Sequence, residues 1–444
     1  MSEQIDTLII FILYLGLFIY IIRMILHSVQ DGWNMVAVFL LFWSIQYLVV
    51  PLSMILNDTV FFLDYKMLDL HVENYLDRFY SYKSFAIISI FLSFFFIGVY
   101  SVKHIDSSAY ILKERTIYIF SREINLLYIM GLFLAFLSLA SLFIYASQFG
   151  GMERAIMAGD AVRSGHGDEF WISKTYIFVY RFIPFSILAI IIFFLLENHK
   201  GFWVNMMLWV ALGVALFSRL ALFKGKQSII ELILLYLFYL SLQNKKSYLF
   251  HFIMLFLFAI FFIPALESYL DTGKFIISNP MNIVQSLLNM LSFFNFDQTS
   301  LEFALNKDYD FVYFEGIISG LRGKFIPISW LTNMNNNTMF TNTYFFYNAR
   351  EAIAPPGVVA FGYYNLGVIG VMITGLFSGF LVQKIEYFFI NITSNNPKFI
   401  ILYAFIMTKV FTWVRTGIPK FTFYDTVMVV LFLLIIIGYK REEK

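Results

Sequence analysis

Long apolar runs separated by short polar connections fill most of the 444-residue chain. A helix needs about 20 mostly apolar residues to cross about 30 Å of hydrocarbon. Because the runs are continuous and do not alternate with polar residues, they favour helices over the strands of a membrane β-barrel. We therefore expect an all-α fold, with residues 1–444 forming a single polytopic membrane domain. About eleven membrane-spanning helices are predicted, at 7–26, 33–56, 84–102, 126–149, 174–196, 203–222, 227–243, 247–266, 363–384, 399–414 and 424–439.

Composition supports a membrane protein and excludes several other classes. Hydrophobic residues make up 60% of the chain and charged residues 14%, whereas soluble domains contain about 25% charged residues. A net charge of +2 and the lack of a basic run argue against a nucleic-acid partner. The chain has no cysteine, so disulfides, thiolate catalysis and cysteine metal sites are excluded.

Charges in the loops predict the orientation. The C-terminal tail and the loop carrying Lys113 and Arg115 are basic, and basic loops face the cytoplasm. The acidic connection at 57–83 then lies outside, and about eleven spans place the N-terminus outside as well. Residues 267–362 contain no span-length apolar run and form a large outer loop, which in a compact protein is usually functional.

Two stretches of this large loop have helical apolar periodicity, at 279–294 and 311–325. They predict amphipathic helices lying on the membrane face. A lid folded over a cavity in the helix bundle is the functional interpretation, and a structural extracellular cap is the alternative.

Cations near the outer ends of the spans are the most informative charges. Arg181 falls about seven residues inside a predicted span, and an arginine or lysine at mid-membrane costs about 2.5–3.5 kcal/mol on insertion scales. Lys409 lies within another span, and Arg415 lies at its outer end. Snorkelling to the interface would explain each cation alone. Together they gather in the outer half, where a cavity lined by them would bind an anion such as phosphate.

Other chemical motifs are weaker. Asp308 and Asp310 form an acid-x-acid pattern that could hold a divalent metal, but such short patterns often match by chance. His166 is a possible proton acceptor or a solvated loop histidine. Because no metal-ligand cluster, P-loop or nucleophile elbow appears, we expect no metal, no cofactor and no ATP-driven transport by this chain alone.

The segment 355–379 combines glycines with a polar core. Its glycines recur at about one-turn spacing, which allows helices to pack closely in lipid. Packing explains Tyr363, Tyr364 and Asn365 less simply, and we expect these three residues to form the wall of a polar cavity facing outward.

These features resemble the bacterial O-antigen polymerases. The shared features are about eleven spans, a large outer loop before the last spans, and the pattern P-P-G-x(4)-G-Y-Y-N-x-G-x-x-G starting at Pro355. The hairpin from Arg219 to Gln227 and the loop stretch Ile326–Trp330 resemble segments of the same family. Arg154 and Gly165 fit an Arg-x(10)-Gly pattern of the family, whereas Arg350 and Gly362 are one residue too far apart.

The resemblance implies a metal-independent glycosyltransferase of the bacterial inner membrane. It would polymerise oligosaccharide repeat units linked to undecaprenyl diphosphate into O-antigen or a related surface polysaccharide, on the periplasmic face. A flippase and a chain-length regulator of the same pathway would be partners. The diphosphate leaving group would be bound by Arg163, Arg181, Arg219, Lys226, Arg322, Arg350 and Arg415.

The identity of the general base stays open at this point. The candidates are Glu315, Glu351, Asp310 and His166. An O-antigen ligase is one alternative function, although residues 267–362 lack the histidine on which that family relies. A flippase or transporter of the lipid-linked oligosaccharide is the other, although the two halves of the chain do not resemble each other.

Overall fold

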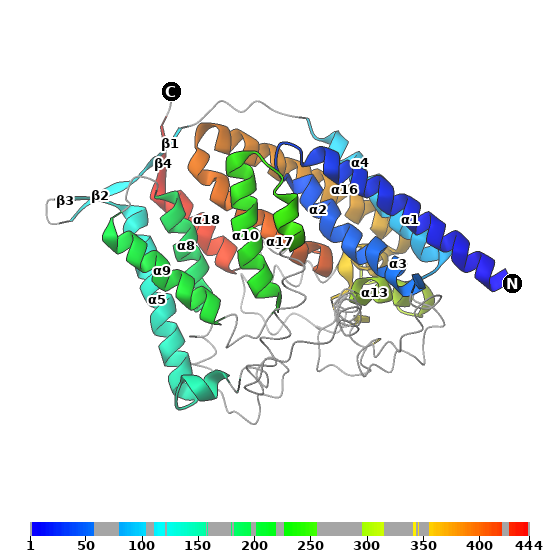
Figure 1. Cartoon of the computed structure of the whole chain (residues 1–444), viewed down its shortest axis with the longest axis horizontal. Helices are drawn as coiled ribbons and strands as arrows, with labels where there is room; N and C mark the ends of the chain where they lie inside the picture. The colour runs from blue at the N-terminus through cyan, green and yellow to red at the C-terminus, as the bar shows by residue number, and fades with distance from the viewer. Residues whose placement is uncertain are drawn as a thin grey trace.

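The computed structural model of the chain describes residues 2–56, 80–103, 111–119, 122–156, 158, 179, 182–196, 201–218, 226–254, 295–314, 341–342, 345, 355–419 and 426–442. Helices dominate these residues (Figure 1). They are α1 (Ser2–Ser28), α2 (Met35–Ser44), the π-helix η1 (Ile45–Val49), α3 (Val50–Leu56), α4 (Tyr82–Ser101), α5 (Leu126–Gln148), α8 (Phe185–Leu195), α9 (Phe202–Phe217), α10 (Lys226–Asn244), α13 (Asn295–Asn306), α16 (Gly357–Asn395), the short η6 (Pro397–Phe399), α17 (Ile400–Thr416) and α18 (Thr426–Gly438).

Six helices of the described residues are long and apolar enough to cross a membrane, which confirms an all-α membrane protein. They cover Gln4–Ser28, Met35–Leu56, Tyr82–Ser101, Leu126–Gln148, Gly357–Asn395 and Pro397–Thr416. Three shorter apolar helices, α8, α9 and α18, coincide with further predicted spans. The total of about eleven stays a prediction, and most of the predicted span at 247–266 lies outside the described residues.

Glycines bring α4 and α16 into close contact, as their spacing predicts. A Cβ atom on Gly375 would lie 2.6 Å from the carbonyl oxygen of Phe91, and one on Gly379 would overlap the carbonyl of Phe95. From the other side, a Cβ on Gly98 would overlap the carbonyl of Leu376. The absence of side chains at these positions therefore allows the two backbones to touch.

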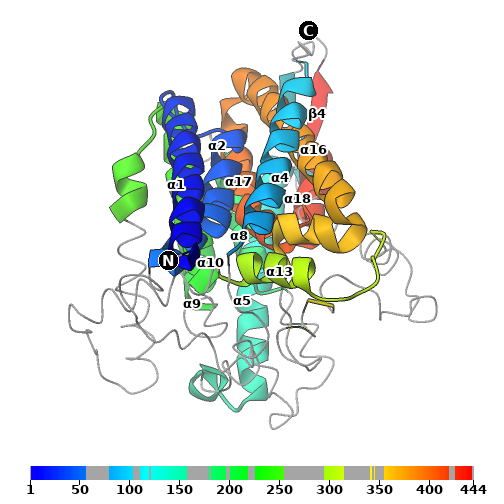
Figure 2. The same cartoon turned by 90° about the vertical axis from the view of Figure 1, so that its right-hand side faces the viewer.

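Helix α16 is broken near its start. Leu366 and Gly367 have non-helical dihedrals, and Gly367 has φ 59° and ψ −140°, a conformation that glycine adopts far more readily than other residues. The arm before the break folds back on the arm after it, because a Cβ on Gly362 would lie 2.8 Å from the carbonyl oxygen of Gly370. Figure 2 shows the short arm turning across the end of the helices beside α13.

Two short antiparallel ribbons, which the sequence did not predict, lie at the other end of the helices. Strand β1 (Ile111–Glu114) pairs with β4 (Tyr439–Glu442), and β2 (Thr116–Ile119) pairs with β3 (Arg122–Asn125). The first ribbon joins the loop after α4 to the C-terminal tail, so the two predicted basic segments lie at the same end. Helix α1 begins toward the α13 end (Figure 2). The hydroxyl of Tyr82, at the start of α4, donates to the carbonyl of Asp6 there.

The large loop differs from its predicted secondary structure where the structure describes it. Residues 311–314 are extended and then turn, with Tyr313 at φ 49° and Phe314 at φ 58°, so the predicted helix at 311–325 does not begin there. The other predicted helix, at 279–294, lies outside the described residues. The helix α13 between the two was not predicted.

Candidate functional site

Helix α13 buries a run of polar side chains under the ends of the membrane helices. It lies across the ends of α4 and the first arm of α16 (Figure 2). Burial of polar and charged groups costs free energy unless they find partners, so the surroundings of each group matter. The buried polar side chains of α13 are Asp297, Gln298, Thr299, Ser300 and Glu302, each no more than 2% exposed.

Asp297 meets the start of α16 and a tyrosine of η1. Gly357 begins α16 with φ 75°, and a Cβ atom there would lie 2.9 Å from Cγ of Asp297 and overlap the hydroxyl of Tyr47. That hydroxyl accepts a hydrogen bond from the backbone N–H of Val359 at 3.2 Å. Only glycine leaves room for the carboxyl group and the hydroxyl to approach this helix start together.

One oxygen of the Asp297 carboxyl group, Oδ1, has no hydrogen-bond partner within the described part of the chain. Burial raises the pKa of Asp297 well above its usual value, and the positive charge of Arg415 at the end of α17 opposes that rise. Helix α13 is not one of the six membrane spans. The site therefore pairs a buried carboxyl group that holds its proton more tightly than usual with a guanidinium close enough to influence it.

The π-helix η1 supplies further polar groups. It arises where the N–H of Val50 donates to the carbonyl of Ile45, five residues earlier, and the following Pro51 has no N–H to restore the α-helical pattern. Such π-helical turns frequently occur at functional sites. Gln46 lies in this turn, and neither its amide nitrogen nor its amide oxygen has a partner within the described residues.

Two more buried polar groups lack a hydrogen-bond partner in the described part of the chain. The indole N–H of Trp43, whose ring lies 5.7 Å from that of Tyr47, and the hydroxyl of Thr299 have no partners among the residues that the structure describes. Buried polar groups in proteins are almost always hydrogen-bonded, so each exception requires an explanation such as water or a ligand. We call the following set the α13 site: Trp43, Gln46, Tyr47, Asp297, Thr299 and Arg415.

A second carboxyl group of α13, that of Glu302, is structural. The hydroxyl of Ser81 donates to its two oxygens at 3.1 and 3.2 Å, and the amide of Asn306 donates to it at 3.3 Å. Ser81 is also the N-cap of α4. Burial raises the pKa of Glu302, and hydrogen bonds from serine and asparagine side chains oppose that rise. Glu302 thus fastens α13 to the start of α4.

Two of the three residues predicted to line a cavity hold the large loop against α16 through hydrogen bonds. The buried hydroxyl of Tyr364 donates to Oδ1 of Asn342 at 3.0 Å. The buried amide of Asn365 donates to the carbonyl of Phe361 at 2.6 Å, and its oxygen accepts from the N–H of Phe314. These bonds attach the large loop to the break in α16. Tyr363 is partly buried, and the role of all three as a cavity wall stays a prediction.

Most other predicted site residues lie outside the described residues. Among the predicted diphosphate ligands, Arg415 alone has a described side chain; Lys226 opens α10, but its side chain is outside the description. Asp310 is exposed on the segment attached to the break in α16. The predicted residues outside the description are Glu315, Glu351, His166, Arg163, Arg181, Arg219, Arg322 and Arg350.

Lys409 has a partner within the membrane-spanning helices. Its ammonium group lies 2.5 Å from the carboxylate of Glu231 on α10, and 4.9 Å from the centroid of the Phe405 ring. Both side chains of the ion pair are largely buried. Pairing, rather than snorkelling to the interface, therefore accounts for this cation.

Sequence reasoning missed Asp297, Thr299 and Gln46. The available signal was the polar run Asp297–Ser300, which lies between Phe296 and Leu301 within a strongly apolar protein. Comparison with known proteins finds no matching family model, no matching curated protein and no matching solved structure. What the fold and site define is thus a class: a polytopic helical membrane protein with a buried polar site at one end.

Proposed function

We propose that the protein is a metal-independent glycosyltransferase that polymerises undecaprenyl-diphosphate-linked oligosaccharide repeat units into O-antigen or a related surface polysaccharide. The observation that carries this proposal is the α13 site, which combines a buried carboxyl group, a nearby guanidinium and unpartnered polar groups at the end of a membrane-spanning bundle. A substrate with a lipid tail, a diphosphate and sugars needs apolar helices, a cation and polar hydrogen-bonding groups side by side. The protein would act in the bacterial inner membrane, with its α13 end periplasmic and its basic β1–β4 end cytoplasmic.

Arg415 would bind the diphosphate of the lipid-linked donor. Its planar fork of donors fits phosphate oxygens, and its charge would stabilise the diphosphate as the bond to the anomeric carbon breaks. The apolar helices would receive the polyprenyl chain. The remaining cations proposed to complete the diphosphate site are Arg163, Arg181, Arg219, Lys226, Arg322 and Arg350.

The test is polymerisation by the purified protein in proteoliposomes that contain lipid-linked repeat units. We expect Arg415→Ala to lose about 30-fold in donor affinity, the equivalent of about 2 kcal/mol for a charged partner. Lys398→Ala, a cation at the opposite end, is the control and should keep its affinity. Equal effects of the two substitutions would contradict a diphosphate site at Arg415.

A transporter of the same lipid-linked oligosaccharide is the second candidate, because of the break in α16. Discontinuous helices near a binding site are typical of secondary transporters. In a polysaccharide-producing strain, loss of the polymerase leaves single repeat units at the surface, whereas loss of a flippase removes all outward-facing repeats. Transfer of finished polymer without elongation would instead indicate a ligase.

A further inference from the structure

We propose that Asp297 binds the attacking hydroxyl group of the acceptor sugar and accepts its proton. This inference rests on the proposed glycosyltransferase function and adds to it the proton acceptor. Three observations support it: the unpartnered oxygen of Asp297, the unpartnered buried polar groups of α2, η1 and α13, and the contrast with the other carboxyl groups of this region.

One oxygen of Asp297, Oδ1, is buried without a hydrogen-bond partner within the described residues. The residue as a whole is 2% exposed. The carboxyl group lies against Gly357, where any side chain would collide with it, and beside the hydroxyl of Tyr47. A proton acceptor needs a free oxygen within reach of the reacting hydroxyl, and a tightly packed surrounding that fixes its orientation.

The unpartnered polar groups of α2, η1 and α13 match a polyhydroxyl compound better than a metal ion. The indole N–H of Trp43 can only donate, so it cannot ligate a metal. The amide of Gln46 and the hydroxyl of Thr299 can both donate and accept. A sugar ring, whose hydroxyl groups also donate and accept, satisfies such a mixture.

The other carboxyl groups of this region are already engaged or exposed. Glu302, on the same helix, accepts hydrogen bonds from Ser81 and Asn306. Asp310, which the sequence suggested as a base, is exposed. Among the described carboxyl groups of α13 and its attached loop, Asp297 therefore combines burial with a free oxygen.

The proposed step balances as follows. The O–H bond of the acceptor hydroxyl breaks, and its proton passes to the carboxylate of Asp297. The hydroxyl oxygen bonds to the anomeric carbon of the donor, and the bond from that carbon to the diphosphate breaks. The diphosphate keeps the electron pair near Arg415, and Asp297 later releases the proton to water. Burial raises the pKa of Asp297 and Arg415 opposes this, so a diphosphate that pairs with Arg415 would make Asp297 a stronger base.

The experiment compares Asp297→Asn with Glu302→Gln in proteoliposomes that contain purified lipid-linked repeat units. Asparagine keeps the shape but accepts no proton, so we expect Asp297→Asn to lose at least about 100-fold in polymerisation rate. Its affinity for the donor and its melting temperature should stay near the wild-type values. Asp297→Glu should retain part of the rate and shift the acidic limb of its pH profile. Glu302→Gln should keep the rate.

Three outcomes would overturn the inference. An Asp297→Asn protein that polymerises within about threefold of wild type shows that Asp297 is not the proton acceptor. A variant that loses donor affinity in parallel with rate shows that Asp297 only positions Arg415. A folded wild-type protein that binds the donor but makes no polymer refutes the glycosyltransferase function itself, and this inference with it.

Discussion

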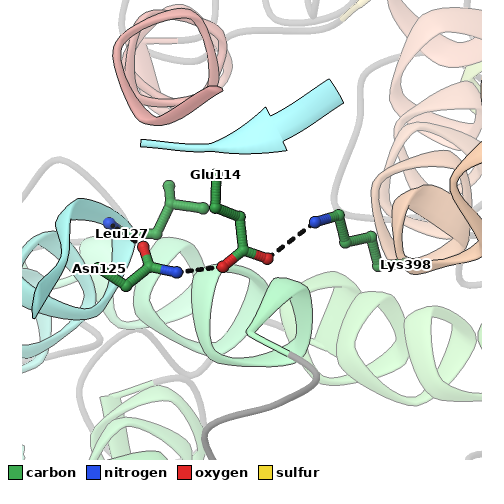
Figure 3. Close-up of polar contacts among 4 residues, drawn as sticks. All are labelled: Glu114, Asn125, Leu127 and Lys398. Carbon is green, nitrogen blue, oxygen red and sulfur yellow. Dashed lines mark hydrogen bonds and ion pairs between the residues drawn. The ribbon is translucent and has the colours of Figure 1, made fainter. Parts of the chain in front are cut away.

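The two ends of the helix bundle differ in how their buried polar groups are paired. At the β1–β4 end, the carboxylate of Glu386 accepts the first N–H of α2, from Met35, at 2.6 Å and the hydroxyl of Tyr403. Figure 3 shows a second paired group there: Lys398 lies 2.7 Å from Glu114, whose other oxygen accepts from Asn125. Each of these charges has a partner that holds two segments together.

At the α13 end, polar atoms of Trp43, Gln46, Asp297 and Thr299 have no partners within the described residues. The chain is also locally unusual there, with a π-helical turn and a break in α16. Proteins depart from such rules mainly at functional sites, where another molecule supplies what the fold leaves unsatisfied. The comparison supports a structural role for the paired end, and it is the basis of the binding role that we propose for the α13 end.

The largest loss of stability is expected from Glu386→Ala, at the β1–β4 end. The substitution removes the carboxylate that accepts from the N–H of Met35 and from the hydroxyl of Tyr403. This loss should lower the free energy of unfolding by about 3 kcal/mol. Thermal unfolding in detergent measures this loss. Glu386→Gln keeps an acceptor oxygen and is the matched control. If the alanine variant is as stable as wild type, the pairing of Glu386 at the β1–β4 end does not stabilise the fold.

A somewhat smaller loss is expected from the ion pair between α17 and α10. Lys409→Met leaves the carboxylate of Glu231 without its cation, at a cost of about 3 kcal/mol in a buried setting, reduced by its residual exposure. The double variant Lys409→Met with Glu231→Leu should recover most of the stability. A double-mutant cycle of unfolding free energies checks this, and additive losses would show that the pair is not coupled.

Local pattern predicted much of the fold but little of the site. Continuous apolar runs predicted the six spans, and glycine spacing predicted that the segment 355–379 packs closely, although the structure alone identifies α4 as its partner. Both features depend only on residues that are close together in the sequence. The partner of Lys409 was not predictable, because Glu231 lies on a distant helix and only the packing of α10 on α17 brings them together.

The site was missed for a related reason. The polar run of α13 has the composition of an exposed loop, and only the tertiary structure shows that it is buried. Pro51 within an apolar span was an available signal that was not used, and the sequence did not show that Gln46 would be buried in a π-helical turn. Arg415 was predicted as a diphosphate ligand because a cation at the outer end of an apolar span is conspicuous on its own, and that role stays a prediction.

The pH dependence of stability offers a further test at the α13 end. Burial raises the pKa of Glu302 above its usual value of 4.5, so the folded protein binds its proton more tightly than the unfolded chain does. This contribution to stability is fully present below pH 4.5 and is lost as the pH rises through the folded-state pKa. Glu302→Gln should therefore flatten the decline in melting temperature over that range. An unchanged slope would mean that Glu302 titrates as it does in the unfolded chain.

The smallest effect on stability, and the sharpest contrast with Glu386, is expected from Gln46→Leu. The substitution removes a buried amide that has no partner within the described residues, so the free energy of unfolding should change by less than about 1 kcal/mol or increase. Affinity for the lipid-linked acceptor should nevertheless fall, because the leucine cannot hydrogen-bond to a sugar. Melting temperature and acceptor titration on the same preparation separate the two effects. A large loss of stability would show that Gln46 has a structural partner, and the difference between the two ends would then disappear at this residue.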